Sequence, residues 1–238
     1  NHGFVYDGRL SAHRGRVHGA PLDRDAQRGR LVGYAQTHDQ VGNRAKGERI
    51  SQLASTERVL IAAGLVLTSP FVPMLFMGEE WAASSPFQFF CDHGDDLAQS
   101  IRDGRRREFA SFGWRPDDIP DPQSLDTFTR SKLDFAELTR DPHARVHAFY
   151  RGLVALRRTN PDLAAGTKCV ARIDGDGDAL VVERGSFAVA ANFGAAGVDV
   201  TLPRAAARIA LSSTPIEANG DKLALPHASI AVVVLVSA

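Results

Sequence analysis

The residues in this chain best suited to chemistry are His38 and Asp39, which directly follow a short apolar run at 31–35. An imidazole and a carboxylate can each bind a hydroxyl group or exchange a proton with a bound substrate. In a barrel of parallel strands, chemistry is done by residues at the carboxyl ends of the strands. The pair is therefore the first candidate for a catalytic position. The simplest alternative for Asp39 is a cap for a helix or turn after the strand.

The elements around this pair are those of a parallel sheet. We expect a strand at 31–36, a helix that starts at Ser55 or Thr56 and runs to about Ser69, and a second strand at 72–77. A helix cannot continue through proline, so Pro70 ends it. Two continuously apolar strands joined by a helix are typical of a parallel sheet that is covered on both faces.

Two further stretches look less regular. Residues 1–30 have few periodic apolar positions, and we interpret them as loop. A long excursion from 82 to 142 is expected to hold mixed loop and short helix, and its length is too great for a passive connector. We interpret its basic cluster at Arg102–Arg107 as a solvated helical face. Apolar residues at three and four spacing predict another helix from 144 to about 158.

The pattern changes after residue 166 to short alternating runs separated by Gly, Asp, Asn and Pro. Such a pattern predicts a small antiparallel sheet or sandwich. We place a domain boundary near residue 164, which gives domains 1–163 and 164–238. The acidic run Asp174–Asp178 lacks the glycine and the glutamate of a calcium loop, and we interpret it as a hairpin turn. We expect no metal ion.

The bulk composition excludes several classes of partner. Lys plus Arg equals Asp plus Glu at 28 each, so nothing favours nucleic acid or an anionic membrane. The apolar run 59–77 contains Pro70 and Pro73, so it is better explained by a helix and a strand than by a membrane span. Two cysteines suggest no disulfide framework, which favours a reducing, cytoplasmic location. The opening residues show no secretory signal and no initiator methionine, and we expect further residues to precede them.

With these motifs in view, the chain resembles the α-amylase superfamily of glycoside hydrolases, and within it the maltooligosyltrehalose trehalohydrolases. His38-Asp39 is similar to the pair that ends barrel strand seven in that superfamily, and the longer run from Thr37 to Arg49 resembles the trehalohydrolases more specifically. Segments similar to the loop after strand six, the end of strand eight, the insertion after it and the closing helix are 3–15, 76–81, 89–109 and 150–163. The resemblance implies the C-terminal portion of a (β/α)8 barrel followed by a small all-β domain.

The resemblance also implies roles for individual residues. Asp39 would hydrogen-bond hydroxyls of the sugar undergoing cleavage and favour its distorted ring, and His38 would donate to a neighbouring hydroxyl. The nucleophilic aspartate and the acid glutamate of this retaining mechanism follow barrel strands four and five, upstream of this chain. The missing N-terminal part of the enzyme is therefore an expected partner, and this chain alone is expected to be inactive. The substrate would be maltooligosyltrehalose or a related α-glucan, and no cofactor is required.

Other side chains are candidates for substrate contacts. Gln40, Asn43 and Arg44 are able to bind hydroxyls, and Arg44 is also able to orient Asp39. Aromatic rings can stack on sugars, although near a strand end they are often core. The aromatic candidates are Trp81, Phe87, Phe89 and Phe90.

The neighbouring carboxylates Glu79 and Glu80 are a weaker candidate pair. Consecutive residues of a strand point to opposite faces, so both cannot flank one bond. We expect one of them to line the site and the other to pair with an arginine. Three alternatives stay open for the whole chain: another α-glucan enzyme such as a glycogen branching enzyme, a non-catalytic carbohydrate-binding fragment, and a degenerate product with no role alone.

Overall fold

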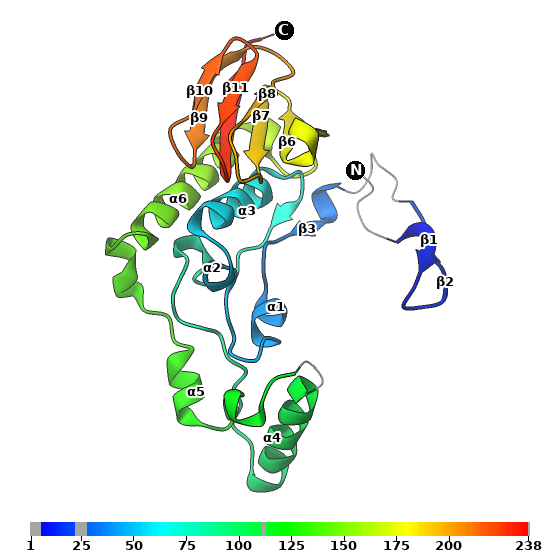
Figure 1. Ribbon diagram of the computed structural model, residues 1–238, viewed down its shortest axis with the longest axis vertical. Coiled ribbons are helices and arrows are strands. Elements are labelled where there is room, and N and C mark those ends of the chain that lie inside the picture. The colour runs from blue at the N-terminus through cyan, green and yellow to red at the C-terminus, as the bar shows by residue number, and fades with distance from the viewer. Residues whose placement is uncertain (1–5, 22–27, 111–112, 238) are drawn as a thin grey trace. The chain divides into compact units, whose positions relative to one another are not determined.

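The computed structural model describes residues 6–21, 28–110 and 113–237 (Figure 1). Its contacts divide the chain into two compact units, each assembled from separate stretches of sequence. The first unit comprises residues 1–33, 60–74 and 151–238, and the second comprises residues 34–59 and 75–150. The domain boundary near residue 164 stays a prediction, because these contacts group stretches in space rather than along the chain.

A β-hairpin lies near the beginning of the first unit, where the sequence pattern predicts loop. Strand β1 (Asp7–Ser11) pairs antiparallel with β2 (Arg16–Gly19). Leu10 and Val17 lie opposite each other, and both side chains are exposed. Because the hairpin does not bury this apolar pair, its strands carry no alternating pattern that would reveal them. The loop prediction is therefore wrong for these residues.

The parallel strands are real but much shorter than expected. Strand β3 (Val32–Gly33) pairs in parallel with β4 (Val72–Pro73), and helix α3 (Thr56–Thr68) lies between them in the sequence. Ser55 caps the helix, since its hydroxyl accepts a hydrogen bond from the Arg58 amide. Val32 and Val72 are exposed, so the described residues do not cover this small sheet. The remainder of the predicted barrel stays a prediction.

Two arginines hold the carboxyl end of α3, where backbone carbonyls have no partner within the helix. The guanidinium of Arg157, on α6 (His143–Thr159), donates to the carbonyl oxygens of Leu67, Ser69 and Phe71 at 2.7–2.8 Å. Arg184, at the end of β6 (Ala179–Arg184), donates to the Thr68 carbonyl. It also donates to the carbonyl of Ala164, which lies between the short turn η5 (Pro161–Leu163) and β5 (Val170–Asp174).

The C-terminal strands form two antiparallel sheets, drawn from yellow to red in Figure 1. The five-stranded sheet has the order β5, β6, β7 (Phe187–Asn192), β12 (Ser229–Leu235) and β9 (Ala206–Ser212). The three-stranded sheet has the order β10 (Glu217–Asn219), β11 (Lys222–Leu225) and β8 (Val198–Thr201). The predicted antiparallel β-domain is thus confirmed. The acidic run is a hairpin turn, η6 (Gly175–Gly177), between the paired strands β5 and β6.

The core of this region lies between the two sheets. Val181, Ala190 and Val233 from the five-stranded sheet form one apolar cluster with Val200 and Leu223 from the three-stranded sheet. The opposite face of the larger sheet is also buried, and helices approach it at glycines. A side chain at Gly64 of α3 would come within 2.5 Å of Ile230, and one at Gly152 of α6 within 3.1 Å of Leu211. At Gly64 a side chain would displace Ile230, so glycine makes room for this contact.

Among the described residues, seven helices and turns lie wholly within the second unit. They are α1 (His38–Gly42), α2 (Ile50–Leu53), η2 (Glu79–Trp81), α4 (Asp95–Ala110), η3 (Pro116–Asp118), α5 (Leu125–Arg130) and η4 (Phe135–Thr139). Helix α4 is 16 residues long, in a region where the sequence predicts only short helix. Its buried positions are Ala98 and Phe109, so apolar periodicity is too sparse to reveal its length.

Candidate active site

His38 and Asp39 begin helix α1 rather than ending a strand. The cap of this helix is Thr37, whose hydroxyl accepts a hydrogen bond from the Asp39 amide at 3.1 Å. The Gln40 side chain completes a capping box by accepting from the Thr37 amide at 2.8 Å. Capping is thus performed by Thr37 and Gln40, and the Asp39 carboxylate is left for another task.

The side chains of His38 and Asp39 lie together in solvent. His38 Nε2 is 3.3 Å from Asp39 Oδ1, and the two side chains are 72% and 70% exposed. A carboxylate that accepts and an imidazole that donates or accepts are thus presented side by side. This arrangement is able to bind two hydroxyl groups of one ligand. Nothing in it requires a metal ion.

The polar neighbours of the pair are divided among several roles. Gln40 uses its amide oxygen in the capping box. Asn43 is exposed, and its backbone amide donates to the Asp39 carbonyl at 3.1 Å. The guanidinium of Arg44 is 3.5 Å from the Glu48 carboxylate, so the ion pair that the structure gives it is with Glu48. Asn43 is thus the neighbour whose side chain is most open to a ligand.

The aromatic candidates differ in accessibility. Trp81 is 3% exposed, and its indole donates to the Glu137 carboxylate at 3.3 Å. Phe90 is half-buried in contact with Phe87 and Phe128. Phe89 is 43% exposed, which makes it the aromatic side chain of this set most able to meet a sugar ring.

Glu79 and Glu80 lie on the 3-10 turn η2 and not on a strand, so the argument from alternating strand faces does not apply. Glu79 is buried, and it accepts hydrogen bonds from the Phe76 amide at 3.2 Å and from the Tyr150 hydroxyl at 3.3 Å. Burial raises the pKa of Glu79 above its ordinary value, although these hydrogen bonds act in the opposite direction. Burial and the Glu79 carboxylate together raise the pKa of Tyr150.

Arg49 is fully buried. In the sequence it is only the end of the Thr37–Arg49 motif, and nothing there predicts a role for its side chain. It donates to the Met77 carbonyl at 2.7 Å and to the Ser85 carbonyl at 2.6 Å. Burial lowers the pKa of Arg49, while the nearby carboxylates, with Glu80 the strongest, act to raise it. Arg49 therefore fixes both ends of the segment that carries η2.

The burial of Arg105 also differs from what the sequence predicts. The sequence predicts a solvated helical face for the basic cluster, but the Arg105 side chain is only 10% exposed. It reaches the carbonyl of Gly42 at the end of α1. Its neighbour Arg106 is half exposed, as predicted.

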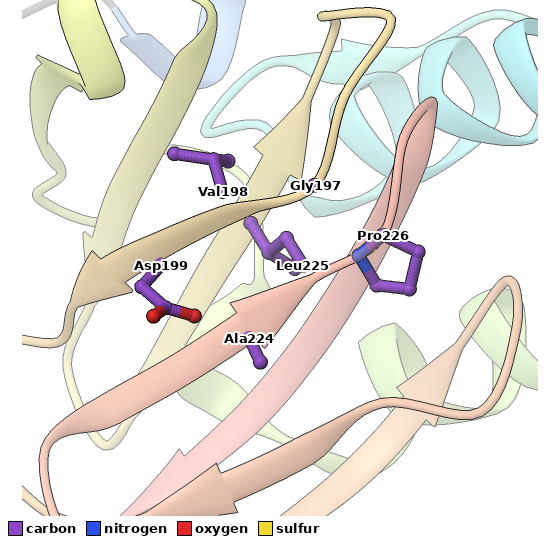
Figure 2. Close-up of a pocket in the computed structure, with 6 residues that line it drawn as sticks. All are labelled: Gly197, Val198, Asp199, Ala224, Leu225 and Pro226. Carbon is purple, nitrogen blue, oxygen red and sulfur yellow. The ribbon is translucent and has the colours of Figure 1, made fainter.

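Among the described residues, pockets lie in both compact units. A cavity of about 340 Å³ lies in the C-terminal sheets. Figure 2 shows the residues that line it, which are Gly197, Val198, Asp199, Ala224, Leu225 and Pro226. Asp199 is the one charged residue in this lining, and none of the six is aromatic. In the second unit, cavities of about 520 and 410 Å³ share Phe90 and Phe128 in their walls. The aromatic walls favour the second unit as the place for a ligand.

Residues 6–21, 28–110 and 113–237 contain no group of three or more His, Cys, Asp or Glu side chains placed to hold a metal ion. Within the same stretches, no helix has the length and apolar character needed to cross a membrane. Cys91 and Cys169 are free thiols.

Comparison with solved structures defines the class of fold. A protein described as a putative α-amylase from Salmonella typhimurium matches 98% of this chain and 40% of its own length, with a TM-score of 0.81 and 33% identity. Isomaltulose synthase SmuA from Protaminobacter rubrum matches 87% of this chain with a TM-score of 0.56, and at 15% identity it shows the fold alone. The chain therefore has the fold of the corresponding part of an α-amylase-like protein.

Sequence relatives narrow this class. Malto-oligosyltrehalose trehalohydrolase of Rhizobium sp. (strain M-11) is 43% identical over 234 residues, which is 97% of this chain and 39% of the relative. The enzyme of that name from Mycobacterium tuberculosis is 49% identical over 81% of this chain and 34% of the relative. The chain is thus a homologue of part of the malto-oligosyltrehalose trehalohydrolases, and the resemblance found in the sequence is confirmed.

The chain spans a little over a third of the length of these relatives. Residues 168–232 also match a family model described as a domain of unknown function (DUF3459). That match lies in the antiparallel C-terminal sheets, outside the segment that carries His38 and Asp39.

Proposed function

We propose that this chain forms part of the active site of a glycoside hydrolase that cleaves the α-1,4-glucosidic bond of maltooligosyltrehalose and releases trehalose. The observation that carries the proposal is the exposed His38–Asp39 pair on a capped turn. Homology to enzymes named malto-oligosyltrehalose trehalohydrolase supports the choice of substrate.

In this proposal Asp39 accepts hydrogen bonds from hydroxyls of the sugar at the cleaved bond. An ionised acceptor strengthens these bonds as positive charge develops on the ring, so it stabilises the transition state more than the bound substrate. His38 binds a neighbouring hydroxyl. Phe89 and Asn43 are the further contacts that exposure favours.

The bond-breaking carboxylates are assigned to the rest of the enzyme. A retaining hydrolase needs a nucleophile and an acid whose carboxyl groups lie about 5–5.5 Å apart. Asp39 has His38 as its close partner, and Glu79 is buried against Tyr150. We therefore propose that the nucleophile and the acid come from the portion of the relatives that this chain does not span.

The test is trehalose release from maltotriosyltrehalose, measured by chromatography. The chain is assayed alone and joined to the portion of a relative, such as the Rhizobium enzyme, that it does not span. We expect release only from the joined protein, and we expect Asp39→Asn to lower kcat by about 10²–10³-fold, as is typical when one transition-state contact is removed. Asp117→Asn, at an exposed carboxylate on η3, is the matched control and should leave kcat unchanged.

Two results would contradict the proposal. If Asp39→Asn kept full activity, Asp39 would have no role in catalysis, and the proposal would lose the residue on which it depends. Equal rates on maltopentaose and maltotriosyltrehalose would instead favour a general α-glucan hydrolase, which is the function suggested by the description of the Salmonella protein.

A further inference from the structure

Arg105 connects helix α4 to the helix that carries His38 and Asp39. Its guanidinium donates a hydrogen bond to the carbonyl oxygen of Gly42, the last residue of α1, across 63 residues of sequence. The last carbonyls of a helix have no partner within the helix, and a cation there also complements the helix dipole. Arg105 thus occupies a position where one side chain can hold the end of α1.

Aromatic rings enclose this arginine. Its guanidinium carbon lies 4.5 Å from the ring centre of Phe109 and 4.9 Å from that of Phe89. The Glu108 carboxylate is 3.3 Å from the guanidinium. Burial lowers the pKa of Arg105, and Glu108 acts against this change. These contacts replace part of the lost hydration and restrict the side chain to one orientation.

An apolar cluster also holds the chain just after α1. Ala45, three residues after α1, packs with Phe109 and Ile119, and Trp114 lies against them. Helix α1 has five residues, and so short a helix is not stable without tertiary contacts. The cap at Thr37 fixes its beginning, and the contacts with α4 fix its end.

We propose that Arg105 is a positioning residue for the candidate active site, because its contact with Gly42 fixes α1 and thereby the side chains of His38 and Asp39. The inference rests on the proposed function for the role of those two side chains. Helix α4, which lies in the 82–142 excursion, would then contribute to catalysis without contacting the substrate.

The neighbouring residue provides a matched control. Arg106 is half exposed, and its ion pair is with Asp103 on the same helix at 3.9 Å. Arg106→Ala removes the same charge from α4 without touching α1. Arg105→Lys keeps the charge but loses the planar group that lies between the two rings, so it should rescue the effect in part.

The first measurement is amide hydrogen exchange in α1. Amides of Val41, Asn43 and Arg44 donate to carbonyls within this segment. Loss of one hydrogen bond from a charged donor corresponds to exchange about 10–100 times faster, and we expect this in Arg105→Ala but not in Arg106→Ala. Unchanged exchange in α1, or an equal increase in the C-terminal sheets, would overturn the proposal.

The second measurement is the kinetics of the joined protein on maltotriosyltrehalose. A misplaced Asp39 weakens transition-state contacts, so Arg105→Ala should lower kcat about tenfold or more with a change in KM of about twofold or less. Faster exchange with normal kcat would overturn the positioning role. If the unmodified protein releases no trehalose, the proposed function fails, and exchange alone decides whether Arg105 fixes α1.

Discussion

The carboxyl group of Glu79 is the acid of the second unit whose surroundings most oppose its charge. It is 3% exposed, and its hydrogen bonds come from neutral donors, the Phe76 amide, the Tyr150 hydroxyl and the Gln36 side chain. Such donors only partly replace the water that an ionised carboxylate loses. Ionisation of Glu79 therefore costs stability, which gives the residue a signature in the pH dependence of unfolding.

We predict that Glu79→Gln gains stability relative to the unmodified chain as the pH rises. Below the ordinary pKa of 4.5, Glu79 is protonated in both folded and unfolded states and contributes no pH dependence. Above that pH the unfolded chain ionises first, so the free energy of unfolding falls until the raised pKa of the folded state is passed. Glutamine does not ionise, so it avoids this loss.

Urea titrations between about pH 4 and pH 8 measure this effect. The control is Glu217→Gln, at an exposed carboxyl on β10, which should show no such trend. A difference between Glu79→Gln and the unmodified chain that is the same at every pH would mean that burial does not raise the pKa of Glu79.

The sequence reveals some residues of the site and hides others for a physical reason. His38 and Asp39 are neighbours in the chain, so their types and their place after an apolar run are enough to single them out. The structural roles of Arg49 and Arg105 become apparent only from their neighbours in the folded chain. Their carbonyl partners lie 28 and 63 residues away, and no local pattern separates a buried arginine from a solvated one.

At the scale of elements, the end of helix α3 depends on one side chain of α6. Arg157 satisfies three carbonyl oxygens, of Leu67, Ser69 and Phe71. We predict that Arg157→Ala lowers the free energy of unfolding by about 2–4 kcal/mol, because hydrogen bonds from a charged donor are lost at a partly buried helix end.

Arg158→Ala is the matched control, because Arg158 is exposed on the same turn of α6. Its effect should stay within about 0.5 kcal/mol, as for most surface substitutions. Urea unfolding of the two variants makes the comparison. Equal losses would mean that general helix propensity, rather than the three carbonyl contacts, explains the effect of Arg157→Ala.

Helices were easier to predict than parallel strands for reasons visible in α3 and β3. Ser55 and Pro70 mark the ends of α3 locally, so its predicted bounds agree with the structure. The apolar run 31–36 forms a ladder over only Val32–Gly33, because the length of a strand depends on its neighbours. The exposed strand β10 and the hairpin β1–β2 bury too little apolar surface to leave a pattern.

At the scale of the whole molecule, apolar side chains remain in solvent around the parallel strands. The exposed residues are Val32, Tyr34, Val72, Met74, Leu75 and Met77. Open strand edges with apolar neighbours promote association. We predict that the isolated 238-residue chain self-associates at micromolar concentration, measured by analytical ultracentrifugation.

Lysine substitutions test the origin of this association. Val72→Lys places a charge on the edge of β4 and should reduce it, whereas Leu125→Lys, on exposed helix α5, should not. A monomer with one sharp, cooperative melting transition would contradict the prediction. Joining the chain to the portion of a relative that it does not span should also abolish the association.

The close approach of Gly64 to Ile230, together with the hydrogen bond from Arg184 to Thr68, has a consequence for protein engineering. The family model covers residues 168–232, which hold most of the C-terminal strands and none of the helices that pack on them. One wall of these strands is helix α3, encoded a hundred residues earlier. A chimera that imports these strands from a relative must therefore also import, or match, the glycine and the helix end on which they rest.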